Sequence, residues 1–309
     1  MKPFGPYALA GWRVLSDLEL PELVAWPVPA DPGRPLRFEA ASAPSISGLR
    51  RFESLGDAGA RLHVGSLALF EIASSGAHVT VHQAPDADPV ELRSVVYGSV
   101  LAILCFQRGL LPLHGASVMI RNRAAILSGP RGAGKSTLAT ALARRGHTLL
   151  SDDVSPVDLR DPARPRLWPA FPRVKLLEDA IASFDLAGAT AYTRAPRGTK
   201  GHFGMASPAL TAAVTEPVPL GAVFALDRED EETVSCTLLP RMAALVFLNS
   251  QTHRAGMGLR MGAQEQIFRQ VYRIASSVPV HRLKRPLDLN RLDESAWRIE
   301  AAMAGDETD

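Results

Sequence analysis

Cysteine is scarce in this chain, since Cys105 and Cys236 are the only two among 309 residues. A small scaffold held together by several disulfides is therefore excluded. Both cysteines lie in apolar segments, which favours two buried thiols over a single disulfide. Near its start the sequence has prolines at positions 3 and 6 and no apolar core with a cleavage site, so we expect no signal peptide.

Long apolar runs and an excess of one charge are also missing. The most apolar stretch, residues 95–106, is about twelve residues long, whereas a helix that crosses a bilayer needs about twenty. The formal net charge is only +2, and the basic residues are scattered rather than grouped in runs. This charge pattern supports neither a nucleic-acid partner nor a membrane partner. Taken together, these absences predict a cytoplasmic protein.

A glycine-rich loop is the most informative feature that the chain does contain. Residues 129–136 have the G-x-x-x-x-G-K-[ST] spacing of a phosphate-binding loop. The apolar run 124–128 before it reads as a buried strand, and residues 137–145 after it read as a helix that ends at Gly146. This is the strand–loop–helix setting that the motif requires. The residues that we expect to contact a nucleotide are Gly129, Pro130, Arg131, Gly132, Ala133, Gly134, Lys135, Ser136 and Thr137.

The chemistry of this loop points to a nucleoside triphosphate with magnesium. Lys135 supplies a positive charge for the β- and γ-phosphates, and Ser136 supplies a hydroxyl for Mg²⁺. The amino-terminal end of the following helix adds a partial positive charge. The alternative is a glycine-rich turn that binds nothing, and the flanking strand and helix argue against it.

A pair of adjacent carboxylates follows the next expected strand, residues 147–151. Asp152 and Asp153 would lie at the carboxyl end of that strand, the edge at which open α/β sheets bind their ligands. Two neighbouring carboxylates repel each other unless a cation shares them. We therefore expect one of them to hold Mg²⁺ while the other accepts a proton from an acceptor hydroxyl. A solvated turn is the alternative reading.

Residues 113–154 resemble the catalytic domain of HPr serine kinase/phosphorylase. A His-Gly pair at residues 114–115 precedes the glycine loop at that family's spacing, and the Arg-Gly-His turn at 145–147 and the Asp pair at 152–153 follow it as in the family. The resemblance implies an ATP-dependent kinase in which the second aspartate is the base towards an acceptor serine and the histidine supports it.

By that resemblance the catalytic roles fall on Asp153, His114 and Lys135, which gives the metal role, with Ser136, to Asp152. The chain as a whole is similar to the HPr-kinase-like proteins encoded with lasso peptide precursors, and the Ser-Asp-x-x-Leu-Pro-Glu-Leu run at 16–23 belongs to that similarity. This implies a peptide or small protein acceptor, with phosphorylation of the carboxyl-terminal serine of a lasso precursor. Members of the wider family are often oligomeric, which implies a homo-oligomer without fixing its subunit count.

Two other functions remain open at this point. One is a P-loop NTPase that acts as a regulatory or binding module, and the other is a small-molecule kinase. The small-molecule kinase remains an alternative because residues 186–207 read as a loop with several basic residues that could close over phosphates. These residues are Arg194, Arg197, Lys200 and His202.

The expected architecture is α/β with two parts. Residues 1–88 are rich in proline and contain short alternating runs, which predicts a small β-rich amino-terminal domain. Residues 89–309 are predicted to form a P-loop, HPr-kinase-like catalytic domain with a mixed sheet. Asp88-Pro89 reads as the start of a buried helix that runs to about Gly109. Residues 220–226 and 233–238 are expected to pair as a hairpin.

Overall fold

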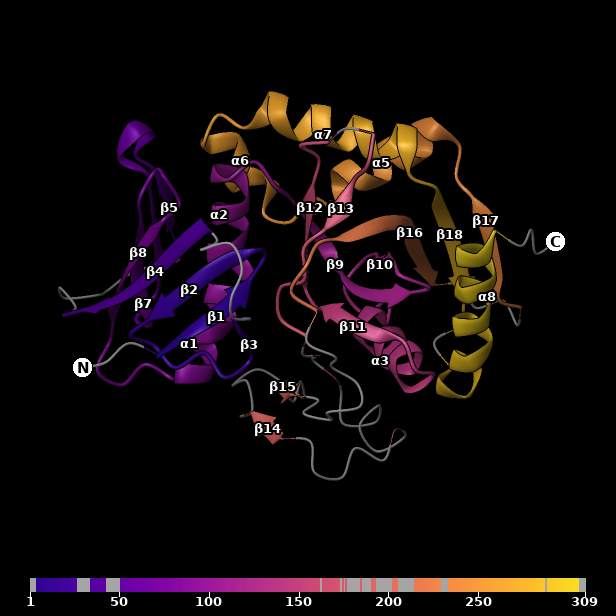
Figure 1. Ribbon diagram of the computed structural model, residues 1–309, viewed down its shortest axis with the longest axis horizontal. Coiled ribbons are helices and arrows are strands. Elements are labelled where there is room, and N and C mark those ends of the chain that lie inside the picture. Colours follow the sequence, from indigo (N-terminus) through magenta and orange to yellow (C-terminus); the bar gives the residue numbers. More distant parts are fainter. Residues whose placement is uncertain are drawn as a thin grey trace.

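Two mixed β-sheets with helices packed against them form this protein, which makes it a mixed α/β structure. In the computed structural model they lie side by side, and the first sheet is at the left of Figure 1. The structure describes residues 4–26, 34–42, 51–161, 163–172, 174, 176, 184, 190–192, 202–204, 214–228, 233–286 and 288–305.

The first sheet contains the expected amino-terminal strands, and it combines parallel with antiparallel pairs. Strand β4 pairs in parallel with both β2 and β8, while the remaining neighbours are antiparallel. Buried and less buried side chains alternate along its strands, as in Trp12–Ser16, so one face forms a core. In spatial order the strands are β3 (Val24–Ala25), β1 (Phe4–Leu9), β2 (Trp12–Ser16), β4 (Arg34–Ala41), β8 (His78–Gln83), β7 (Ala68–Ile72), β6 (Ala60–Val64) and β5 (Arg51–Ser54).

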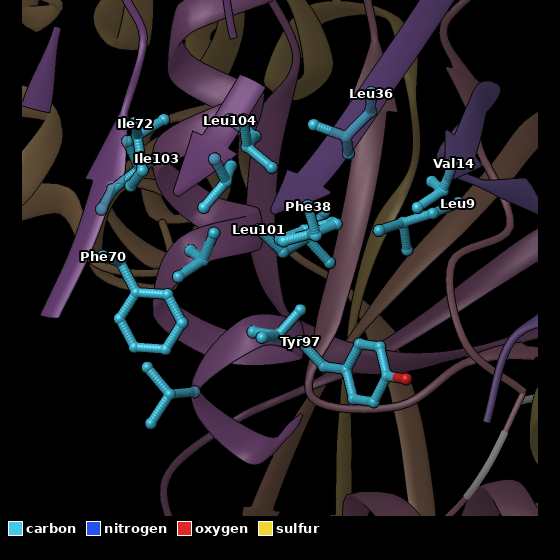
Figure 2. Packing of buried hydrophobic residues seen from close by; sticks show 14 of the residues in the cluster. Leu9, Val14, Leu36, Phe38, Phe70, Ile72, Tyr97, Leu101, Ile103 and Leu104 are labelled. Atoms are coloured by element: carbon cyan, nitrogen blue, oxygen red, sulfur yellow. The ribbon is translucent and has the colours of Figure 1, made fainter. Parts of the chain in front are cut away.

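A long buried helix covers that face. It comprises α1 (Pro89–Val95), the π-helical segment η2 (Val96–Val100) and α2 (Leu101–Gln107). The start was predicted correctly, because the Asp88 side chain accepts a hydrogen bond from the Val90 N–H and proline occupies the first turn. Figure 2 shows the resulting core, in which Tyr97, Leu101, Ile103 and Leu104 of the helix meet side chains of the first sheet.

This helix bears on two of the sequence-based expectations. By length and composition alone, Pro89–Gln107 could span a membrane, although 78% of its apolar window is buried inside the protein, as in the core helix of a globular fold. The helix is thus longer than its most apolar stretch, residues 95–106, and its bounds agree with the expected range of 89 to about 109. It also shares a core cluster with the first sheet, although residue 89 was the expected start of the second domain. The boundary between residues 88 and 89 stays a prediction.

The second sheet holds the glycine-rich loop. Strands β10, β16 and β18 run parallel to one another, and the pairs of β9, β12, β13 and β17 are antiparallel. The strands are β10 (Arg123–Ser128), β9 (Leu111–Ile120), β12 (Val154–Asp158), β13 (Arg166–Leu167), β16 (Val218–Arg228), β18 (Val280–Arg285) and β17 (Ser235–Leu238), with β11 (Thr148–Ser151) beside β9. A separate pair is formed by β14 (Thr190–Tyr192) and β15 (His202–Gly204).

Helices cover both faces of the second sheet. Helices α3 (Lys135–Arg144) and α8 (Leu292–Ala304) share one core cluster with the sheet, and α5 (Arg241–Ser250) and α7 (Gln264–Ser277) share another. In Figure 1 α7 and α5 lie along the top and α3 lies below. The remaining short helices are η1 (Gly56–Ala58), α6 (Ala255–Arg260) and η3 (Leu289–Arg291).

The expected hairpin between residues 220–226 and 233–238 is wrong. Strand β18 lies between β16 and β17, in parallel with β16 and antiparallel to β17. Helices α5, α6 and α7 connect β17 to β18, and this long crossover brings β18 back alongside β16. The expectation of two buried thiols is confirmed for Cys105; Cys236 is also free, but it is half-buried rather than buried.

Part of the basic loop predicted at residues 186–207 lies outside the described residues. This applies to Arg194, Arg197 and Lys200. Only the backbone of His202 is described, as part of β15. The closing role proposed for this loop therefore stays a prediction.

Candidate active site

One edge of the second sheet gathers the residues that the sequence singled out. Strands β10 and β11 both end there, because each pairs in antiparallel fashion with β9, with Ser128 opposite Gly115 and Ser151 opposite Ser117. The glycine loop follows β10, the two aspartates follow β11, and His114 lies near the start of β9. Strand order thus places three segments that are distant in sequence at the edge where α/β sheets bind ligands.

The glycine loop turns sharply out of β10 and into α3. A Cβ atom at Gly129 would lie 2.7 Å from the main-chain oxygen of Leu226 on β16, so the loop can leave the sheet along this path only with glycine. Gly134, the residue before α3, has a φ of +79° in the left-handed region that favours glycine. Both glycines therefore have steric reasons to be where they are, and the turn leaves the first N–H groups of α3 facing outwards.

Two cations contact the main chain of this loop. The Nζ atom of Lys135 donates hydrogen bonds to the carbonyl oxygens of Gly129 (2.8 Å) and Pro130 (3.1 Å), which places its charge at the mouth of the loop. Arg285, at the end of β18, is buried and donates from Nη2 to the Ala133 oxygen at 3.0 Å. Burial lowers the pKa of this guanidinium to about 10, so it stays charged at neutral pH and adds positive potential beneath the loop.

A hydroxyl and a carboxylate converge next to the loop. Ser136 Oγ, in the first turn of α3, donates to both carboxylate oxygens of Asp152, at 2.9 and 3.0 Å, and Asp152 is only 3% exposed. Mg²⁺ prefers such hard oxygen ligands, and it is usually bound by one or two carboxylates together with waters and substrate phosphates. Within the described residues no cluster of three or more His, Cys, Asp or Glu side chains could hold a metal. The donor set therefore fits magnesium carried by a nucleotide better than a resident metal.

Asp153 differs from its neighbour in both conformation and exposure. Its φ is +69°, in the left-handed region that residues other than glycine rarely adopt. Its side chain is 33% exposed, so this carboxylate is open to an incoming group while that of Asp152 is enclosed. Unusual backbone conformations of this kind concentrate at functional sites.

His114 faces the same turn. Its Nδ1 atom lies 3.0 Å from the main-chain oxygen of Asp153 and 3.6 Å from Oδ1 of that residue. A carbonyl oxygen can only accept, so the shorter contact requires the proton on Nδ1. Burial and the nearby charge of Lys135 lower the pKa of His114, which leaves the ring neutral at neutral pH with Nε2 as an acceptor. The imidazole thereby holds the turn that carries Asp153.

The turn between α5 and α6 reaches this site as well, and sequence reasoning missed it. The His253 ring stacks on His114 with centroids 5.3 Å apart. Main-chain bonds from His114 N to the Gln251 oxygen (2.7 Å) and from His253 N to the Pro112 oxygen (2.8 Å) fix the turn to β9. Arg254, the next residue, also contributes to lowering the pKa of His114. No local motif marks residues 251–254, so only the fold reveals them.

The structure brings most of the predicted site residues together. Lys135, Ser136, Asp152, Asp153 and His114 lie at one sheet edge, joined by the contacts above. Of the other loop residues, Pro130, Arg131 and Gly132 are exposed, Ala133 is buried, and Thr137 is half-buried in α3. The catalytic, nucleotide-binding and metal-binding roles assigned to all of these residues stay predictions.

Comparison with known proteins finds likenesses among solved structures. No family model and no curated protein matches the chain. Among solved structures the chain is similar to the HPr(Ser) kinase/phosphatase from Coxiella burnetii, at 14% identity and a TM-score of 0.32, covering 63% of this chain and 97% of the other. Its name is that of the family that residues 113–154 resemble. Because the identity and the TM-score are both low, the match fixes neither the fold nor the activity of this chain.

Proposed function

We propose that this protein is an ATP-dependent serine kinase that transfers the γ-phosphoryl group of Mg²⁺-ATP to a hydroxyl of a peptide or protein. The observation that carries the proposal is the pairing of unlike carboxylates beside the glycine loop. Asp152 is enclosed and bonded to Ser136, whereas Asp153 is open and lies against His114. A phosphoryl transfer to an alcohol needs both kinds, one for a metal and one for a proton.

On the phosphate side, the loop and its cations would bind the triphosphate. Lys135 would turn from the Gly129 and Pro130 oxygens to phosphate oxygens, since Lys135 is only half-buried and the neighbouring Pro130 is exposed. Ser136 and Asp152 would hold Mg²⁺, which when bound neutralises charge on the β- and γ-phosphates. The buried Arg285 adds a fixed positive charge below the loop.

On the acceptor side, Asp153 would accept the serine proton as the hydroxyl oxygen forms its bond to phosphorus and the bond to ADP breaks. A serine hydroxyl is barely acidic, so its proton leaves only as the phosphoryl group arrives, and a nearby carboxylate is a sufficient base. His114 is a positioning residue in this scheme, since its shorter contact is to the main chain of Asp153.

The identity of the acceptor comes from the resemblance alone. We propose the carboxyl-terminal serine of a lasso peptide precursor as the acceptor. A cytoplasmic location and a homo-oligomeric state belong to the same proposal. A nucleotide-hydrolysing regulatory module and a small-molecule kinase are the competing outcomes of the experiment that follows.

The test offers a lasso precursor, HPr and a panel of free sugars and amino acids to the full chain with labelled ATP and Mg²⁺, and reads the products by mass spectrometry. We expect a mass gain of one phosphate on a polypeptide, at serine. Phosphate on a small molecule alone would establish the small-molecule kinase. Release of inorganic phosphate with every acceptor unmodified would establish the hydrolysing module.

A further inference from the structure

A groove runs between the first sheet and α6, next to the candidate active site. It has a volume of about 410 Å³. Strand β5 and helix α6 contact each other and lie close together in Figure 1, so the groove lies where the first sheet meets the helical connection between β17 and β18. Its lining residues are Phe52, Leu62, Arg254, Gly256, Met257 and Arg260.

The groove combines an apolar floor with two cations. Phe52 and Leu62 are buried in the core of the first sheet, and Met257 packs against that core. Arg254 and Arg260 are exposed, and Arg260 Nη1 makes one long contact of 3.4 Å with the Phe52 oxygen. Among the residues that the structure describes, neither arginine has a carboxylate within ion-pairing distance.

Two arginines elsewhere in the protein do have a carboxylate partner. Arg61 of the neighbouring β6 pairs with Glu71 at 2.6 Å, and Arg269 of α7 pairs with Glu265 at 3.7 Å. The groove is lined by two exposed guanidiniums together with apolar residues, an arrangement complementary to an acidic and partly apolar chain.

The groove is also connected to the acceptor side of the candidate site. Arg254 follows His253, whose ring stacks on His114, and main-chain bonds fix this turn to β9. The field of Arg254 is felt at His114, where it lowers the pKa of the imidazole. A chain that binds Arg254 therefore contacts the same turn that holds His253 against His114.

We propose that this groove binds an acidic segment of the acceptor peptide, with Arg254 and Arg260 holding a carboxylate and Phe52 and Met257 contacting an apolar side chain next to it. The inference rests on the proposed peptide kinase function and names its substrate class: a peptide with an acidic residue near the phosphorylated serine. Arg254 and Arg260 are substrate-positioning residues in this proposal.

Binding of defined peptides to the full chain tests the groove without any reaction. The probes are three fluorescein-labelled serine peptides that contain a leucine beside a glutamate, a glutamine or a lysine, and the readout is fluorescence anisotropy. We expect the glutamate peptide to bind about tenfold more tightly than the glutamine peptide, and the lysine peptide to bind most weakly. Added salt should reduce the preference. Equal affinities for the three peptides would overturn the proposal.

Substitutions then assign the preference to the two arginines. Arg254→Gln and Arg260→Gln should each reduce it, and the double variant should remove it while binding a fluorescent ATP analogue as the wild type does. Arg269→Gln is the matched control, an exposed helical arginine away from the groove, and should keep the full preference. Circular dichroism reports whether each variant is folded. Arg260→Glu reverses the charge at this position and should therefore bind the lysine peptide more tightly than the wild type does. A preference that persists in the folded double variant contradicts the proposal.

Turnover with the same peptides separates this inference from the function on which it rests. We expect Arg260→Gln to raise KM for the glutamate peptide about tenfold and to leave kcat near the wild-type value. If the three peptides are phosphorylated with the same kcat/KM, the kinase assignment stands and the groove proposal is wrong. If the glutamate peptide binds through the arginines and no peptide is phosphorylated, the groove stands as a peptide site and the kinase assignment is wrong.

Discussion

The two sheets of this protein bury very different side chains. In the first sheet the described core is apolar except for Ser16, and its largest members are Phe38 and Phe70. In and around the second sheet the buried set includes polar and charged groups, concentrated along the edge described above. These groups are Ser117, Ser128, Thr140, Ser151, Asp152, Ser155, Asp158 and Arg285.

This difference in buried polar groups indicates which sheet carries the candidate catalytic residues. Burying a polar group without a partner costs about 1–3 kcal/mol, so a fold keeps such groups only where they are bonded or used. Most members of this set are hydrogen-bonded, as Asp152 is to Ser136 and Arg285 is to Ala133. Hydrogen-bonded carboxylates at the first sheet, such as Glu22 and Glu71, are more exposed than Asp152, and this sheet also supplies an apolar wall to the groove near Arg254. The predictions below are ordered by expected effect, and each would break or sharpen this contrast.

The largest effect is expected for Lys135→Ala. Removing the ammonium at the mouth of the loop takes away the charge that would stabilise the transferring phosphate, and we expect phosphoryl transfer to fall about a thousandfold or more. Lys135 is half-buried and its ammonium donates to loop carbonyls rather than lying in a hydrophobic core, so the fold should survive. Turnover with labelled ATP and circular dichroism measure the two effects. Wild-type turnover in a folded Lys135→Ala protein would contradict the kinase assignment.

The two aspartates should separate into two phenotypes. Asp153→Asn removes the open carboxylate, and we expect kcat to fall about a hundredfold to ten-thousandfold with little change in ATP affinity. Asp152→Asn disturbs the enclosed partner of Ser136 and should raise the Mg²⁺ concentration needed for half-maximal activity. Steady-state kinetics over a magnesium series distinguish the two. A collapse of ATP affinity in Asp153→Asn, with a mild effect in Asp152→Asn, would reverse the assigned roles.

A matched pair of core truncations compares the sheets directly. Phe38 in β4 and Phe224 in β16 are both fully buried, and replacing either with alanine should lower the free energy of unfolding by about 3–5 kcal/mol. Phe224 lies opposite Leu127 of β10, just before the glycine loop, so Phe224→Ala should also lower kcat. Phe38→Ala should keep kcat within about twofold when assayed well below its unfolding temperature. Equal losses of kcat in both variants would show that the first sheet has a direct role in catalysis.

Local sequence patterns were sufficient for the elements around the loop but not for the order of strands. The apolar run 124–128 and the Asp88-Pro89 signal predicted β10 and the start of α1, because both depend on neighbouring residues alone. The hairpin between β16 and β17 was wrong because nothing between residues 228 and 235 excludes it. The exclusion comes from β18, which follows the helices from Arg241 to Ser277 in the chain and pairs with both strands.

The candidate site divides along the same line. Lys135, Ser136 and the two aspartates could be chosen from sequence because they follow strands at fixed spacing, and His114 because of its resemblance to a family motif. Arg254 and Arg285 could not, since their relevance arises from a turn fixed to β9 and from burial beneath Ala133. Both are common residue types without a motif, and only tertiary contacts distinguish them from the other arginines.

The smallest effect concerns the pH dependence of stability, through His281 of β18. Its ring stacks on Phe224 with centroids 5.4 Å apart, and burial lowers its pKa below the ordinary value of 6.5. As the pH falls through about 6.5, the unfolded chain therefore takes up this proton before the folded chain does, and the free energy of unfolding decreases until the pH is below the folded-state pKa. Above about pH 8 the ring is neutral in both states and contributes nothing. His281→Gln should thus lose less stability than the wild type when urea unfolding at pH 8 and at mildly acidic pH are compared, although His114 still contributes a decrease of the same sign. An unchanged pH dependence in His281→Gln would mean that this ring is protonated equally easily in the folded and unfolded chains.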